Sequence, residues 1–102
     1  MAQFVKVAGT DEMAAGSIKQ VEINGKSIAL FNLDGNYYAI GNECTHKGGP
    51  LAEGSVEGES VICPWHGGQF NIKTGAVEGA PPAKPVAKYN VRVQGSDIEV
   101  EI

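Results

Sequence analysis

Two short motifs, Cys44-Thr45-His46 and Cys63-Pro64-Trp65-His66, stand sixteen residues apart (47–62) in the middle of the chain. They contain both cysteines and both histidines of the 102-residue sequence. Two thiolates and two imidazoles form a ligand set typical of zinc sites and of iron–sulfur clusters. The segment 44–66 is therefore the candidate metal site, and we expect the rest of the chain to fold around it.

The residues that precede this segment predict an antiparallel β-meander. Asn24-Gly25 is a strong hairpin signal because both residues tolerate a positive φ. Val21 and Ile23 flank the polar Glu22, as in a strand with one buried face. We expect strands over 4–7, 17–23, 27–33 and 37–40, and only a short helical turn over 10–15.

The residues from 41 to 79 are rich in glycine and predict brief strands over 60–62 and 69–72, separated by loops. After the stiff segment 79–85, regular alternation returns: Ala87, Tyr89, Val91 and Val93 are expected on one face, and a last strand follows over 98–102. The predicted fold class is all-β, with an antiparallel sandwich or barrel-like framework. It forms one domain over 1–102, with a loop-rich subdomain over about 42–82 that carries the site.

Composition excludes several classes of function. A net charge of −4 and a pI near 5.0 disfavour nucleic acids and anionic membranes as partners. The sequence has no run of the roughly 20 apolar residues that a membrane helix needs. It shows no secretory signal, and its two cysteines do not make a disulfide framework, so we expect a cytoplasmic protein.

Negative charge is concentrated around the motifs. Five glutamates between 43 and 78 (Glu43, Glu53, Glu57, Glu59 and Glu78) stand against Lys47 and Lys73, so this segment carries −3 of the net −4. The acids either keep a small domain in solution or help a basic partner to dock.

The pattern C-x-H…C-x-x-H resembles the signature of Rieske [2Fe–2S] proteins, in which two histidines replace two cysteines on one iron. The resemblance implies one [2Fe–2S] cluster, with Cys44 and Cys63 on one iron and His46 and His66 on the other. It extends to the segments 51–54 and 63–67, to Phe70 with Thr74-Gly75, and to a proline-containing loop at 79–82. The alternative is a four-coordinate zinc site, whose familiar spacings instead place like ligands together.

Other residues would surround the cluster by the same resemblance: Lys47, Gly48, Trp65, Gly67, Gly68 and Pro81. For Trp65 two roles stay open, a hydrophobic shield or packing residue on one side and a partner contact on the other.

The chain departs from the respiratory branch of the Rieske family. Extra cysteines bridge the two ligand loops there, whereas the equivalent positions here are Gly49 and Trp65. Hydroxyl donors to the cluster are replaced by Gly68 and Phe70, which implies a lower reduction potential.

The chain is more similar to the small soluble Rieske ferredoxins of ring-hydroxylating dioxygenase systems. That resemblance implies a monomeric one-electron carrier, not an enzyme, that passes electrons from a flavin-dependent reductase to a terminal oxygenase. Two alternatives stay open: a Rieske-like small subunit of a larger reductase such as nitrite reductase, and a zinc-binding interaction module.

Overall fold

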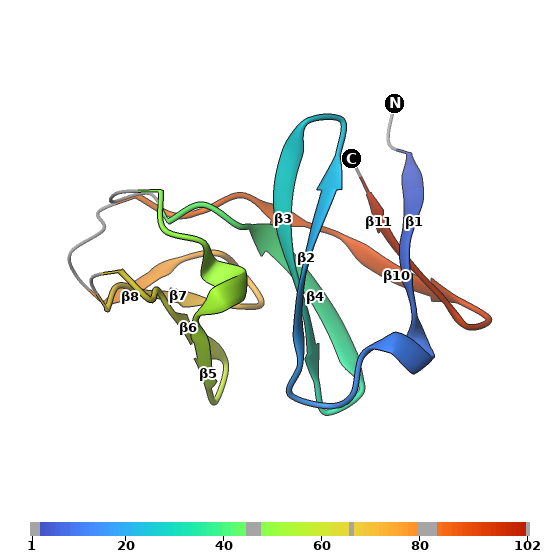
Figure 1. Ribbon diagram of the computed structural model, residues 1–102, viewed down its shortest axis with the longest axis horizontal. Coiled ribbons are helices and arrows are strands. Elements are labelled where there is room, and N and C mark those ends of the chain that lie inside the picture. Colours follow the sequence, from blue (N-terminus) through green and yellow to red (C-terminus); the bar gives the residue numbers. More distant parts are fainter. Residues whose placement is uncertain (1–2, 45–47, 66, 80–83, 102) are drawn as a thin grey trace.

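The computed structural model describes residues 3–44, 48–65, 67–79 and 84–101. Its strands form three antiparallel sheets, ordered β1-β11-β10, β2-β3-β4-β9 and β5-β6-β7-β8 (Figure 1). The strands are β1 (Phe4–Gly9), β2 (Ile18–Ile23), β3 (Lys26–Leu33), β4 (Asn36–Gly41), β5 (Ser55–Glu57), β6 (Ser60–Ile62), β7 (Gln69–Asn71), β8 (Val77–Gly79), β9 (Lys88–Tyr89), β10 (Val91–Gln94) and β11 (Asp97–Glu101). Two short 3-10 helices, η1 (Thr10–Glu12) and η2 (Leu51–Glu53), complete the described elements. The all-β fold class is confirmed.

The three sheets follow one another along the molecule. In Figure 1 the β5–β8 sheet lies at one end, the strands β2, β3 and β4 lie in the middle, and β1, β10 and β11 lie at the other end. The first and last strands, β1 and β11, pair with each other, so both ends of the chain belong to the sheet farthest from β5–β8.

Strand β3 separates two hydrophobic cores. Ile28 and Leu30 belong to the core shared with the β1-β11-β10 sheet, whereas Ala29 and Phe31 belong to the core shared with the β5–β8 sheet. All four side chains are fully buried. Because successive strand residues point to opposite faces, the unbroken apolar run 28–31 fits a strand that is covered on both sides.

The turn between β2 and β3 is the hairpin predicted from Asn24-Gly25. Both residues have positive φ, 51° and 79°, as such a two-residue turn requires. The helical turn expected over 10–15 is shorter, since η1 covers only Thr10–Glu12. None of the helices in the described residues is long and apolar enough to cross a membrane.

The alternation over 87–93 does not form one strand with a single buried face. Residues 88–89 pair with β4 as β9, whereas residues 91–94 pair with β11 as β10, so the chain changes sheets at Asn90. The Asn90 carbonyl accepts a hydrogen bond from the Glu101 backbone N–H (2.8 Å), and its side-chain amide donates to the Glu101 carboxylate (2.7 Å). Val93 is left 45% exposed.

Two strands that the sequence did not predict, β5 and β8, complete the third sheet. Each is three residues long, and glycines stand at or beside their ends, including Gly54, Gly58 and Gly79. Such short segments carry too little alternation to be distinguished from loops. Their pairing with β6 and β7 gives a sheet of four short strands, and Cys63 lies between β6 and β7 in the chain.

Candidate metal centre

The two cysteines that are far apart in sequence lie next to each other in the structure. Cys44 follows β4 and Cys63 follows β6, and their side chains are within hydrogen-bonding reach of each other. Both are buried, at 4% and 2% exposure, and both are free thiols. The fold thus brings together the two thiols that the sequence analysis assigned to one iron.

The predicted ligands His46 and His66, together with Lys47 and Pro81, lie outside the described residues. Within the described ranges, which leave out both histidines, no group of three or more His, Cys, Asp or Glu side chains is gathered at one point.

The loop that contains Cys44 is closed by two backbone hydrogen bonds. The Cys44 N–H donates to the Gly49 carbonyl (2.8 Å), and the Gly48 N–H donates to the Cys44 carbonyl (2.7 Å). Gly48 has a φ of 76°, in the left-handed region that favours glycine. The loop is thus held at both ends by its own backbone.

The loop that contains Cys63 repeats this pattern. The Cys63 N–H donates to the Gly68 carbonyl (2.7 Å), and the Gly67 N–H donates to the Cys63 carbonyl (3.2 Å). Gly67 has a φ of 74°, almost the value of Gly48 in the first loop. Two six-residue loops of the same closure therefore present the two thiols, and Gly48, Gly67 and Gly68 all take part in closing them.

Asn42 anchors the first loop, a role that the sequence analysis missed. This residue is 3% exposed, and its side-chain amide donates to the Ser27 hydroxyl on β3 (3.1 Å). Its side-chain oxygen accepts from the Ala52 N–H (2.7 Å), and its carbonyl accepts from the Leu51 N–H (2.7 Å). A single asparagine after a strand forms no local pattern, so only the fold reveals that it ties β3 to η2.

Gly49 and Trp65, the positions equated with the bridging cysteines of the respiratory branch, are in contact across the two loops. A Cβ added to Gly49 would lie 3.1 Å from both Cγ and Cδ2 of the Trp65 ring and 2.7 Å from Cys63 Sγ. Such distances leave no room for a side chain. Gly49 is buried, whereas the Trp65 side chain is 51% exposed.

The electrostatics of the thiol pair suit a bound metal. Burial raises the pKa of Cys63, and the neighbouring Cys44 raises it further, while a hydrogen bond from the Trp65 backbone N–H acts in the opposite direction. Two buried thiolates side by side need positive charge to compensate them, and ferric or ferrous iron supplies it. Side chains of the adjoining core, including Leu51, Phe70 and Ile72, surround the pair with apolar surface. The described donors therefore fit one sulfur-ligated half of an iron–sulfur cluster.

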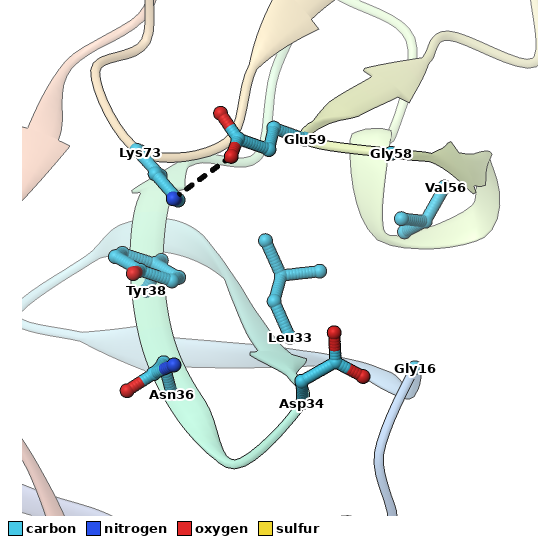
Figure 2. Close-up of a pocket in the computed structure, with 9 residues that line it drawn as sticks. All are labelled: Gly16, Leu33, Asp34, Asn36, Tyr38, Val56, Gly58, Glu59 and Lys73. Carbon is cyan, nitrogen blue, oxygen red and sulfur yellow. Dashed lines mark hydrogen bonds and ion pairs between the residues drawn. The ribbon is translucent and has the colours of Figure 1, made fainter.

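A groove of about 400 Å³ lies away from the thiols, and neither cysteine lines it. Figure 2 shows Leu33, Asp34 and Tyr38 on one side and Glu59 and Lys73 on the other. Lys73 pairs with Glu59 (2.9 Å), and its Nζ lies 5.7 Å from the centre of the Tyr38 ring. Since Tyr38 belongs to β4 and Glu59 precedes β6, these contacts join the middle sheet to the β5–β8 sheet.

Comparison with known proteins identifies the family. Residues 3–90 match the model of the Rieske [2Fe–2S] domain. The chain belongs to the Rieske family. Its cofactor is a [2Fe–2S] cluster, in agreement with the cluster predicted from the motifs.

Relatives of this Rieske protein are similar over almost their whole length. It is 36% identical to the biphenyl dioxygenase ferredoxin subunit of Pseudomonas sp. (strain KKS102), over 96% of this chain and 91% of that protein. It is 32% identical to the ferredoxin component of the naphthalene 1,2-dioxygenase system of Pseudomonas aeruginosa, over 98% and 96% of the two chains.

Solved structures give the same result. The ferredoxin of carbazole 1,9a-dioxygenase from Nocardioides aromaticivorans IC177 superposes with a TM-score of 0.92 at 32% identity, over 96% of both chains. The nitrite reductase small subunit of Mycobacterium tuberculosis has a TM-score of 0.90 over 100% of this chain and 96% of that chain. Its identity is only 24%, so this second likeness concerns the fold.

Proposed function

We propose that this Rieske protein is the ferredoxin component of a ring-hydroxylating dioxygenase system, a one-electron carrier without catalytic activity of its own. The observation that carries the proposal is the whole-length likeness to ferredoxin components of biphenyl, naphthalene and carbazole dioxygenases, at 32 to 36% identity. A solved complex of reduced oxygenase and oxidised ferredoxin in carbazole 1,9a-dioxygenase contains a chain 32% identical to this one, with a TM-score of 0.90 over 95% of this chain and 91% of that one. By analogy, a terminal oxygenase accepts the electron.

The proposed ligands are Cys44 and Cys63 on one iron and His46 and His66 on the other. The contact between the two buried thiols supports the first pair. When bound, the cluster supplies reversible one-electron transfer at a potential raised by its neutral imidazole ligands. The chain's own part is to hold both thiols on loops that are closed by backbone hydrogen bonds and to keep water from the sulfurs. Gly48, Gly67 and Gly68 serve the first task and Trp65 the second, while Lys47 and Pro81 remain predicted neighbours of the cluster.

We further propose that the chain is one domain over 1–102 in which residues 42 to about 82 form a cluster-binding subdomain. The separate β5–β8 sheet supports this division, and the hydrophobic core beneath it is shared with Ala29 and Phe31 of β3. The flavin-dependent reductase as electron donor, the monomeric state and the cytoplasmic location are also parts of the proposal. Sedimentation of the purified protein and reduction by candidate reductases test two of them directly.

The decisive experiment is the EPR spectrum of the dithionite-reduced protein. We expect a rhombic signal with the low average g-value of mixed cysteine and histidine ligation. A spectrum typical of four thiolate ligands would remove the histidines from the site. A colourless, EPR-silent protein that contains zinc would replace the electron carrier by an interaction module.

Substitution of the proposed histidine ligands tests the assignment residue by residue. His46→Cys or His66→Cys replaces a neutral ligand by an anionic thiolate, which disfavours the additional electron. We expect a lower midpoint potential in any variant that retains an intact cluster. A midpoint that stays equal or rises would contradict the assignment of that histidine.

A further inference from the structure

Trp65 is unusual among the described side chains because it is large, apolar and half exposed, yet it lies directly beside a buried thiol. Its ring rests on Gly49 of the other loop, where an added Cβ would approach two ring atoms to 3.1 Å. The same Cβ would approach Cys63 Sγ to 2.7 Å, so ring, glycine and sulfur are packed against one another.

The backbone of Trp65 acts on the same sulfur. Its N–H hydrogen-bonds to the Cys63 side chain. This bond depends on the position of the chain at residue 65, and the ring helps to fix that position because it is held against Gly49.

We propose that the Trp65 indole is a positioning residue that clamps the two cysteine loops together. It is seated on Gly49, it keeps the Trp65 N–H directed at the Cys63 sulfur, and it excludes water from that sulfur. The clamp thereby determines how long the cluster stays bound and contributes to its potential. The inference rests on the proposed ligation by Cys44 and Cys63.

The experiment compares cluster-loaded wild type with Trp65→Ala, Trp65→Phe and Val93→Ala. Val93 is the matched control, since it is likewise a large apolar side chain, 45% exposed, but lies on β10 in the sheet farthest from the cysteines. Trp65 is half exposed and is not a member of either hydrophobic core, so its truncation acts on the first core only through Cys63.

The first readout is the rate at which the reduced protein releases iron to a ferrous-iron chelator. Loss of the half-buried ring is expected to accelerate release on the order of tenfold in Trp65→Ala. Trp65→Phe keeps an aromatic ring on Gly49, so its rate of iron release should stay close to that of the wild type. Val93→Ala should release iron at the wild-type rate. Failure of Trp65→Ala to assemble a cluster while its far-UV circular dichroism stays native also supports the clamp.

The second readout is the midpoint potential, which a purely structural role would leave unchanged. Water that reaches the Cys63 sulfur stabilises the more negative reduced state, so Trp65→Ala should shift to a more positive potential and Trp65→Phe should not. The clamp is refuted if Trp65→Ala matches Val93→Ala in both iron release and potential.

Failure of the proposed function is distinguishable from failure of the clamp. If the wild type lacks the mixed-ligand EPR signal, the ligand assignment is wrong. The clamp is then judged on the metal-free protein by the alkylation rate of its two thiols. Faster alkylation in Trp65→Ala than in Val93→Ala supports it, and equal rates overturn it.

Discussion

The two cysteine loops have the same backbone closure but different surroundings. In each, the cysteine N–H bonds to a glycine carbonyl five residues later, and a glycine N–H bonds back to the cysteine carbonyl. The first loop is anchored to the middle sheet by Asn42. The second is instead flanked by the strands β6 and β7 and carries the Trp65 ring that covers the first.

The shared closure and the unshared surroundings of the two loops have different tasks. The shared closure fixes the direction of each thiol, and it depends only on backbone bonds and on glycines with positive φ. The unshared contacts set where each loop sits in the molecule and how far water approaches the sulfurs. Equivalent substitutions in the backbone closure of the two loops should therefore have equal effects. A substitution in the unshared contacts should affect only the loop that makes them.

Gly49→Ala should have the largest effect, because it inserts a methyl group between the loops. The new Cβ would lie 2.7 Å from Cys63 Sγ, although the backbone conformation of Gly49 itself suits alanine. We expect cluster assembly to be lost, with an overpacking penalty of about 1–3 kcal/mol. Iron content and the visible spectrum measure the first effect. Fluorescence of Trp65, the single tryptophan of the chain, should shift to the red as its ring is displaced.

The control for this change is Gly48→Ala at the neighbouring position. A Cβ there meets no atom of the described residues within 4 Å, so the strain expected is that of the backbone. Equal cluster content in the two variants would contradict the tight contact between the loops.

Asn42→Ala should have the next largest effect, confined to the first loop. It leaves the partly buried Ala52 N–H without its acceptor and removes the bond to Ser27. Loss of these contacts should lower the free energy of unfolding by about 2–3 kcal/mol. Thermal unfolding of the cluster-loaded protein checks this value. The exposed Asn36→Ala is a comparison variant, and similar losses in both would show that Asn42 is no special anchor.

Much of the fold could be predicted from local patterns. The Asn24-Gly25 turn fixes the register between β2 and β3, and that pairing runs from Ile18↔Phe31 to Ile23↔Lys26. The apolar run 28–31 was correctly assigned to a strand, but its burial on both faces went unrecognised. A continuous apolar run is typical of a strand that is buried on both faces, so the sequence does contain a sign of this burial.

Other features had no local sign. Nothing in the alternation over 87–93 indicates that the chain changes sheets at Asn90, since the bonds that define the change are made with Glu101 at the far end of the chain. The contact of the Trp65 ring with Gly49 also has no local pattern, and only the resemblance to the Rieske family pairs the two positions in advance. The cysteine pair was predictable because metal ligation leaves a conspicuous residue pattern, whereas its anchors and its cover are ordinary residues in long-range contact.

Gly48→Ala and Gly67→Ala test the shared part of the two loops. Both glycines are exposed and have φ near 75° (76° and 74°), and an added Cβ would meet no atom of the described part of the chain within 4 Å. Each substitution should therefore lower the free energy of unfolding by the same amount, about 1 kcal/mol. Chemical denaturation of the two variants in parallel measures the difference. A loss that is several times larger in one loop would show that the loops are not equivalent in their backbone closure.

Acid should weaken the contact between the strands that flank the second loop, because it protonates Glu78 there. This is the smallest of the expected effects. Hydrogen bonds from the Ser60 hydroxyl and, next in importance, from the Asn71 amide lower the pKa of Glu78 from its ordinary value of 4.5. Ser60 begins β6 and Asn71 ends β7, so this carboxylate joins the two strands that flank the Cys63 loop. The anchor of the first loop, Asn42, does not titrate.

The direction of the pH dependence follows from the lowered pKa of Glu78. The stabilisation by Glu78 is fully present above the unfolded-state pKa and is lost as the pH falls through the lower folded-state value. Glu78→Gln removes this dependence while keeping the size of the side chain. Thermal midpoints of wild type and Glu78→Gln, measured between neutral pH and pH values below 4.5, should therefore converge on acidification. Parallel curves would mean that Glu78 does not support the loop, and the second loop would then depend on its backbone closure and on Trp65.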